Sequence, residues 1–165
     1  MIAQSMLGEF DYEMSNLRKV LQRVPEDKPS YAPHPKSMPM ARLAGHLAEL
    51  TDWLTTILAT DELDFAKGEY KPFAPATRAE LLARFDQGVA ASRKALAGAT
   101  DQQMMANWTL KNGDTVYFTM PRVAVIRSMV LNHIIHHRAQ LGVYLRMNDV
   151  PIPGLYGPSA DEPGM

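Results

Sequence analysis

Apolar positions recur at helical spacing in four stretches of the chain. Steps of three and four residues put such positions on one face of a helix with 3.6 residues per turn. The pattern predicts helices over residues 1–24, 40–59, 77–97 and 119–147. The inward-facing positions of the four helices, in chain order, are Ala3, Leu7, Phe10, Met14, Leu17, Leu21 and Val24; Leu43, His46, Leu50, Trp53 and Ile57; Leu81, Phe85, Val89, Ser92 and Leu96; and Val123, Ile126, Val130, His133, His137, Leu141 and Tyr144.

The segments between these helices differ in character. Prolines make residues 25–39 a stiff, extended connection, whereas residues 60–76 are charged and long enough for a crossover or a lid. Asn112-Gly113 lies between two short apolar runs, which is a hairpin signal. We therefore predict an all-α fold, a four-helix bundle with a short irregular or hairpin insert before the last helix. Residues 1–165 are expected to form a single domain that ends in an extended tail over residues 150–165.

Composition narrows the classes of function. The chain has 165 residues, a formal net charge of -1 and no cysteine. A balanced charge without a basic stripe argues against a nucleic-acid partner, and no apolar run reaches the ~20 residues that cross a membrane. Metal ligands must come from His, Asp, Glu or water, because thiolates are absent. The lack of cysteine is compatible with a cytoplasmic protein, which is the location we expect.

Three histidines occupy inward positions of two predicted helices. His133 and His137 are one helical turn apart, so their rings can converge on a point, and His46 belongs to the second helix. A lone histidine in such a stripe is usually a core residue with a polar partner. Three unpartnered imidazoles would each cost about 1–3 kcal/mol, whereas one metal ion would satisfy all three. We therefore predict that His46, His133 and His137 are metal ligands and leave one coordination position open.

Neighbouring polar residues are candidates for supporting roles. His136 lies at the edge of the stripe, and Gln140 lies close to its centre, so both are expected beside the ligands rather than among them. Glu49 follows His46 by three residues and is a weak candidate for a catalytic base that activates water. The alternative for Glu49 is a carboxylate at the solvent edge of its helix.

Several motifs of the sequence resemble the DinB-like family, which is grouped with the DinB/YfiT-like metalloenzymes. The resemblance extends over nearly the whole chain, although Ala139 stands where the family usually has glycine. The motifs that carry it are Gly45-His46-Leu47-Ala48-Glu49-Leu50, His133-Ile134-Ile135-His136-His137-Arg138-Ala139-Gln140-Leu141, Tyr144-Leu145-Arg146, Val150-Pro151 and Tyr156-Gly157-Pro158-Ser159-Ala160-Asp161-Glu162. It implies a four-helix bundle in which His46, His133 and His137 bind a divalent metal, with zinc or nickel expected.

The resemblance also implies a range of functions. Some relatives are transferases or isomerases that use a low-molecular-weight thiol such as bacillithiol or mycothiol, and many members form homodimers. We expect a metal-dependent enzyme that acts on small molecules, such as a thiol-dependent transferase. The alternatives are a metal-dependent hydrolase, a non-catalytic stress-linked dimer, and a plain bundle with core histidines. The tail segment Tyr156 to Glu162 is expected either to fold back over one end of the bundle, to cross to a dimer partner, or to pack loosely.

Overall fold

Four long helical segments form the body of the protein. The computed structural model describes residues 1–163. The segments are α1 (Ile2–Leu21), α2 (Met40–Ala59), α3 (Arg78–Gly98) and a last helix made of α5 (Arg122–Val125), the π-helical stretch η2 (Ile126–Asn132) and α6 (His133–Arg146). Helix α1 packs against α3 and α6, and α2 packs against the same two helices. The apolar stripes predicted from the sequence meet in the core between them.

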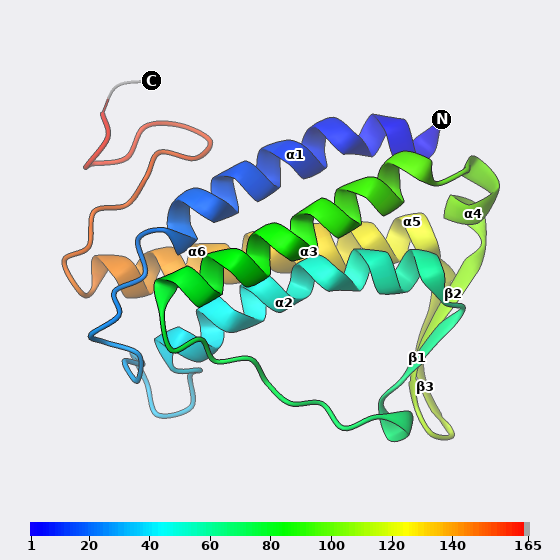
Figure 1. Cartoon of the computed structure of the whole chain (residues 1–165), viewed down its shortest axis with the longest axis horizontal. Coiled ribbons are helices and arrows are strands. Elements are labelled where there is room, and N and C mark those ends of the chain that lie inside the picture. The colour runs from blue at the N-terminus through cyan, green and yellow to red at the C-terminus, as the bar shows by residue number, and fades with distance from the viewer. Residues whose placement is uncertain (164–165) are drawn as a thin grey trace.

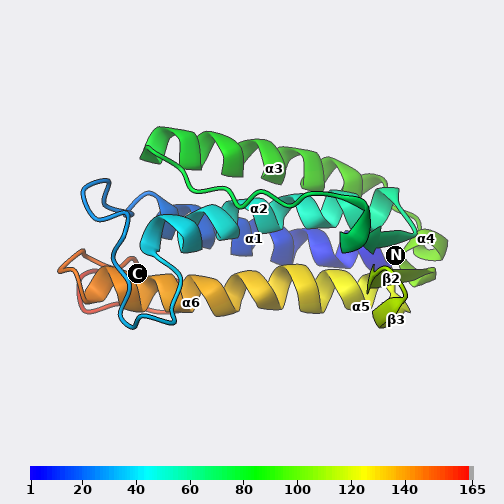
Figure 2. The same ribbon diagram turned by 90° about the horizontal axis from the view of Figure 1, so that it is seen from below.

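The direction of the helices explains the long connection after α2. Helices α2 and α3 run the same way, so residues 60–77 return along the length of the molecule (Figures 1 and 2). This connection lies directly on α2, because a Cβ atom added at Gly45 would come within 2.1 Å of the Phe73 carbonyl oxygen. Within residues 1–163, no helix is long and apolar enough to cross a membrane.

The all-α prediction is wrong, because a three-stranded mixed sheet lies at one end of the helices (Figure 1). Its strands are β1 (Glu62–Asp64), β2 (Asn107–Asn112) and β3 (Thr115–Pro121). Strand β1 pairs parallel to β2, and β2 pairs antiparallel to β3. The short helix η1 (Phe65–Lys67) directly follows β1, and the short helix α4 (Asp101–Met105) directly precedes β2. The fold is therefore mixed, and part of the expected loop over residues 60–76 is strand and 3-10 helix.

The hairpin predicted at Asn112-Gly113 is present, and a side chain from β1 supports its turn. Gly113 has φ +58°, a left-handed conformation that glycine adopts without steric cost. The Asp64 carboxylate accepts hydrogen bonds from the Gly113 amide at 2.8 Å and from the Ala66 amide at 3.0 Å. One residue thus connects β1, η1 and the β2–β3 turn.

The last helix begins later than predicted and is not regular. It starts at Arg122 after the Pro121 end of β3, and residues 126–132 take the wider π-helical turn. The buried positions of α6 are Ile134, Arg138, Leu141, Tyr144 and Leu145, rather than the two histidines of the predicted stripe. The His133 and His137 side chains are half-buried at the edge of the core, on the side that faces α2.

The C-terminal tail folds back on the same chain, at the end of the helices opposite the sheet (Figures 1 and 2). The Tyr156 hydroxyl donates to the buried Glu13 carboxylate at 2.8 Å. Glu13 also pairs at 2.8 Å with Arg138, a buried side chain of α6. Further along the tail, Asp161 pairs with Arg146 at 2.6 Å. The tail is thus attached to both α1 and α6 through polar contacts.

Candidate metal centre

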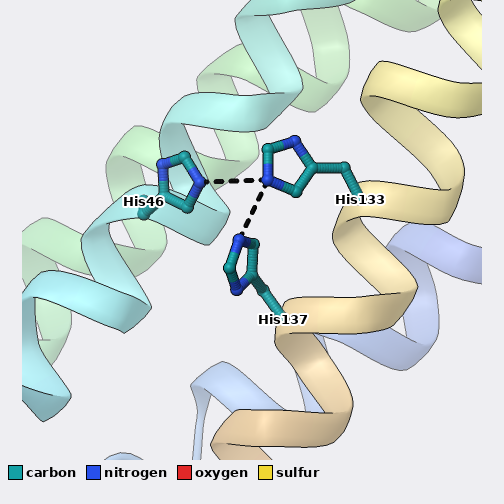
Figure 3. Close-up of side chains that lie close together, drawn as sticks. All are labelled: His46, His133 and His137. Atoms are coloured by element: carbon teal, nitrogen blue, oxygen red, sulfur yellow. Dashed lines mark hydrogen bonds between the residues drawn. The ribbon is translucent and has the colours of Figure 1, made fainter. Parts of the chain in front are cut away.

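The structure brings the three candidate histidines to one point between α2 and α6. Their Nε2 atoms face one another: His137 and His133 are separated by 2.9 Å, and His46 and His133 by 3.5 Å (Figure 3). One nitrogen from each ring lies within 4.8 Å of the others. Ring centroids are 4.7–5.2 Å apart across the three pairs. The residues are half-buried, so the cluster is reachable from solvent.

Helical geometry accounts for the convergence. His133 and His137 are separated by one turn at the start of α6, which aligns their side chains on one face. His46 comes from the facing surface of α2, which packs against α6. The π-helical stretch ends immediately before His133, and such widened turns are frequent at functional sites. A π turn changes the rotation of every later side chain about the helix axis, and here the histidines point to α2 while Ile134 points to the core.

The Nδ1 contact of His137 indicates which of its two ring nitrogens carries the proton. His137 Nδ1 lies 2.7 Å from Gln140 Oε1, an oxygen that can only accept. His137 is therefore protonated on Nδ1, and its Nε2 lone pair points into the cluster. The Nδ1 atoms of His46 and His133 are buried, and among residues 1–163 they have no hydrogen-bond partner. Gln140 therefore contacts the ring of one candidate ligand.

The cluster resists protonation. Burial, followed by the charges of His137, His133 and Arg42, lowers the pKa of His46 from its ordinary 6.5 to about 4. The pKa values of His133 and His137 are also lowered, in both cases mainly by burial. All three imidazoles are therefore neutral near pH 7, and their Nε2 atoms face one another. Such an arrangement is repulsive unless a proton or a cation lies between the nitrogens.

These residues fit a divalent metal ion. Zinc binds histidine nitrogen at about 2.0–2.1 Å, so tetrahedral ligand atoms are about 3.3 Å apart. The observed Nε2 separations of 2.9 Å and 3.5 Å lie on either side of that value. Within residues 1–163 no carboxylate joins the cluster as a further ligand. Three neutral nitrogen ligands are the donor set of zinc sites that keep one position open for water or substrate.

The Glu49 carboxylate, the weak candidate for a catalytic base, has three hydrogen-bond donors. It accepts hydrogen bonds from Arg42 at 3.1 Å, Tyr70 at 2.9 Å and the Phe73 amide at 2.9 Å. Three donors leave about one acceptor site of the carboxylate free, and the Tyr70 and Phe73 bonds attach the 60–77 connection to α2. His136 is exposed, and the centroid of its ring lies 4.9 Å from the centroid of the His137 ring. His136 therefore contacts a candidate ligand ring from outside.

Sequence reasoning missed Arg42 and a cavity beside His46. The cavity has a volume of about 460 Å³ and is lined by α2 and by residues 63–70. Four residues of α2 line this cavity: Arg42, His46, Glu49 and Trp53. Their steps of four, three and four residues form one face of a helix, which is a signal that the sequence contained. The opposite wall could not be predicted, because it depends on where the connection lies.

Comparison of the sequence with known protein families shows which family the chain belongs to. A family model described as the DinB superfamily matches residues 9–141. The chain belongs to the DinB superfamily. No curated protein matches its sequence significantly.

Solved structures of other DinB-like proteins share the fold. A DinB-like protein from Bacillus cereus ATCC 10987 superposes with a TM-score of 0.73 at 21% identity, covering 93% of this chain and 97% of that one. A DinB-like protein from Bacillus subtilis has a TM-score of 0.68 at 15% identity, covering 89% of this chain and 95% of the other. At these identities the likeness establishes a common fold for this DinB-superfamily chain and leaves its chemistry to its own residues.

Proposed function

We propose that this DinB-superfamily protein is a metal-dependent enzyme that activates a thiol for transfer to a small molecule. His46, His133 and His137 would hold a divalent ion, zinc or nickel, through their Nε2 atoms. The observation that carries the proposal is the convergence of three neutral imidazole nitrogens within 4.8 Å. When bound, such an ion lowers the pKa of a coordinated thiol or water so that it loses its proton near neutral pH.

The residues around the cluster favour a thiol over a water nucleophile that needs a base. The carboxylate of Glu49 is occupied by three donors, so it is unsuited to deprotonate water. Arg42 lies near His46 and His137 and disfavours their protonation, and its own charge is paired with Glu49. In the transfer, the thiol proton leaves to solvent, sulfur bonds to an electrophilic carbon, and the leaving group departs with the electrons of its broken bond. Gln140 would hold the His137 ring in its ligating orientation.

A thiol-transfer assay on protein reconstituted with zinc or nickel tests the proposal. Low-molecular-weight thiols are combined with an aromatic electrophile, and product is measured with wild-type and His137→Ala protein. We expect turnover by the wild type and a loss of at least about a hundredfold in the variant, together with loss of bound metal. Metal binding without turnover of thiols, but with turnover of esters or amides, would favour the hydrolase instead. Metal binding without any turnover would favour the non-catalytic alternative.

We also propose that the protein is a homodimer, the assembly that the family resemblance implies. Sedimentation equilibrium of the metal-loaded chain should give twice the mass of one chain. A mass equal to one chain across micromolar concentrations would contradict this.

A further inference from the structure

The cavity beside His46 has walls of two kinds. Helix α2 supplies Trp53 on one side, and the connection that follows α2 supplies Leu63 from β1 and Phe65 from η1 on the other. The Trp53 and Phe65 ring centroids are 6.5 Å apart at an angle of 53°. Phe65 remains 41% exposed, although a large apolar side chain of this kind is usually covered. These three side chains therefore present an open apolar surface next to the candidate metal centre.

Most polar groups around the cavity already have partners within the protein. Arg42 donates to Glu49 at 3.1 Å and to the Tyr70 hydroxyl at 2.5 Å, and Tyr70 donates to Glu49 at 2.9 Å. The Asp64 carboxylate is bonded to backbone amides of the sheet. A ligand inside the cavity thus meets mainly carbon surfaces and aromatic rings, with His46 and the exposed Glu69 also on the wall. A volume of about 460 Å³ is within the range of small-molecule sites.

We infer that this cavity binds the apolar part of the second substrate, an aromatic ring or branched hydrocarbon group, and that Trp53, Leu63 and Phe65 determine specificity. The inference rests on the proposed function, because His46 belongs both to the cluster and to the cavity wall. A substrate held there has its apolar group against the rings and its reacting atom toward the histidines. Substrates without such a group lose the burial that positions them.

Binding of prodan, an uncharged naphthalene dye, to the metal-free full chain tests the cavity without any metal chemistry. We expect one dye per chain with blue-shifted emission. Trp53→Ala and Phe65→Ala should each weaken binding about tenfold, because each removes an aromatic face. Trp53→Phe and Phe65→Leu should retain most of the affinity. Circular dichroism establishes that each variant is folded.

The chain offers a matched control in a second apolar groove. Met147 is 58% exposed and lines a separate groove of about 390 Å³ formed by residues of α1, α6 and the C-terminal tail. Met147→Ala should leave dye affinity within twofold of the wild type. Equal binding by wild type, Trp53→Ala and Phe65→Ala would overturn the inference, as would a loss confined to Met147→Ala. Elemental analysis of the same variants after incubation with zinc or nickel and removal of free metal reports separately on the proposed function, whose failure would appear as absent metal with dye binding intact.

Discussion

At the residue scale, the site depends on where each imidazole nitrogen points. The spacing of His133 and His137 and the inward position of His46 were sufficient to select all three from the sequence. The hydrogen-bond partners around these histidines could be predicted only in part. The contact between His137 and Gln140 follows from helical spacing, but the occupation of Glu49 by Tyr70 and Phe73 depends on a distant connection.

Replacing Gln140 tests the orientation of His137. Gln140→Leu removes the acceptor for Nδ1–H, so the ring and its proton are free to rearrange. Metal affinity should fall about 10–100-fold. Gln140→Glu keeps an acceptor and should retain wild-type affinity, as should Gln102→Leu on the exposed side of α4. Competition titration against a chromophoric chelator measures the affinities, and equal values for Leu and Glu at position 140 would contradict the assigned hydrogen bond.

The lowered pKa of His46 makes the metal-free protein sensitive to acid. The unfolded chain binds a proton at this residue near pH 6.5, whereas the folded chain does so only at about 4. Unfolding therefore takes up protons between these values, and stability must fall as pH decreases through that range. Above about pH 7.5 this contribution is flat. Thermal unfolding from pH 7.5 to 4.5 should show a shallower decrease for His46→Asn than for the wild type.

The matched control for that series is His34→Asn in the exposed proline-rich connection. This variant should follow the wild-type pH curve. If His34→Asn flattens the curve and His46→Asn does not, the assignment of the acid-sensitive group is wrong.

At the element scale, amphipathic periodicity located the four long helices, and α2 matches its predicted range of residues 40–59. Strand β1 was missed because only three residues form it and its partner β2 is more than forty residues away. A strand of that length has too few side chains for a period to be visible. The π-helical stretch was missed for a related reason, since its sequence has the apolar character of ordinary helix.

The contact between the tail and the helices supports a stability prediction. Glu13→Ala would leave the guanidinium of Arg138, which is only 2% exposed, without its carboxylate partner. Breaking a buried pair in this way costs about 3–5 kcal/mol. Tyr156→Phe removes one hydroxyl that bonds to Glu13 and should cost about 1–3 kcal/mol. Urea unfolding measures both, and a larger loss for Tyr156→Phe than for Glu13→Ala would contradict this ranking.

At the scale of the whole molecule, the sheet and the crossover connection form one wall of the site. Helices α2 and α6 present the histidines, and the long return from α2 to α3 encloses the cavity beside them. Parallel α2 and α3 require that return, and the pairing of β1 with β2 and the bonds to Glu49 fix its course. The mixed topology is thus directly connected to the proposed function, because it places an apolar wall beside the candidate metal ligands.

Metal binding should stabilise the whole protein. A ligand that binds only the folded state at a hundred times its dissociation constant adds about 2.7 kcal/mol to the free energy of unfolding. Zinc or nickel should therefore raise the melting temperature of the wild type, and a chelator should reverse the increase. His133→Ala should melt at the same temperature with and without metal. An unchanged melting temperature in the wild type would indicate that the histidines are ordinary structural residues.

Anomalous diffraction from crystals of the metal-loaded protein, recorded at the absorption edge of the metal, tests the central claim most directly. The account predicts one strong peak about 2.0–2.1 Å from the Nε2 atoms of His46, His133 and His137. A peak elsewhere, or one that contacts fewer than these three nitrogens, would contradict it.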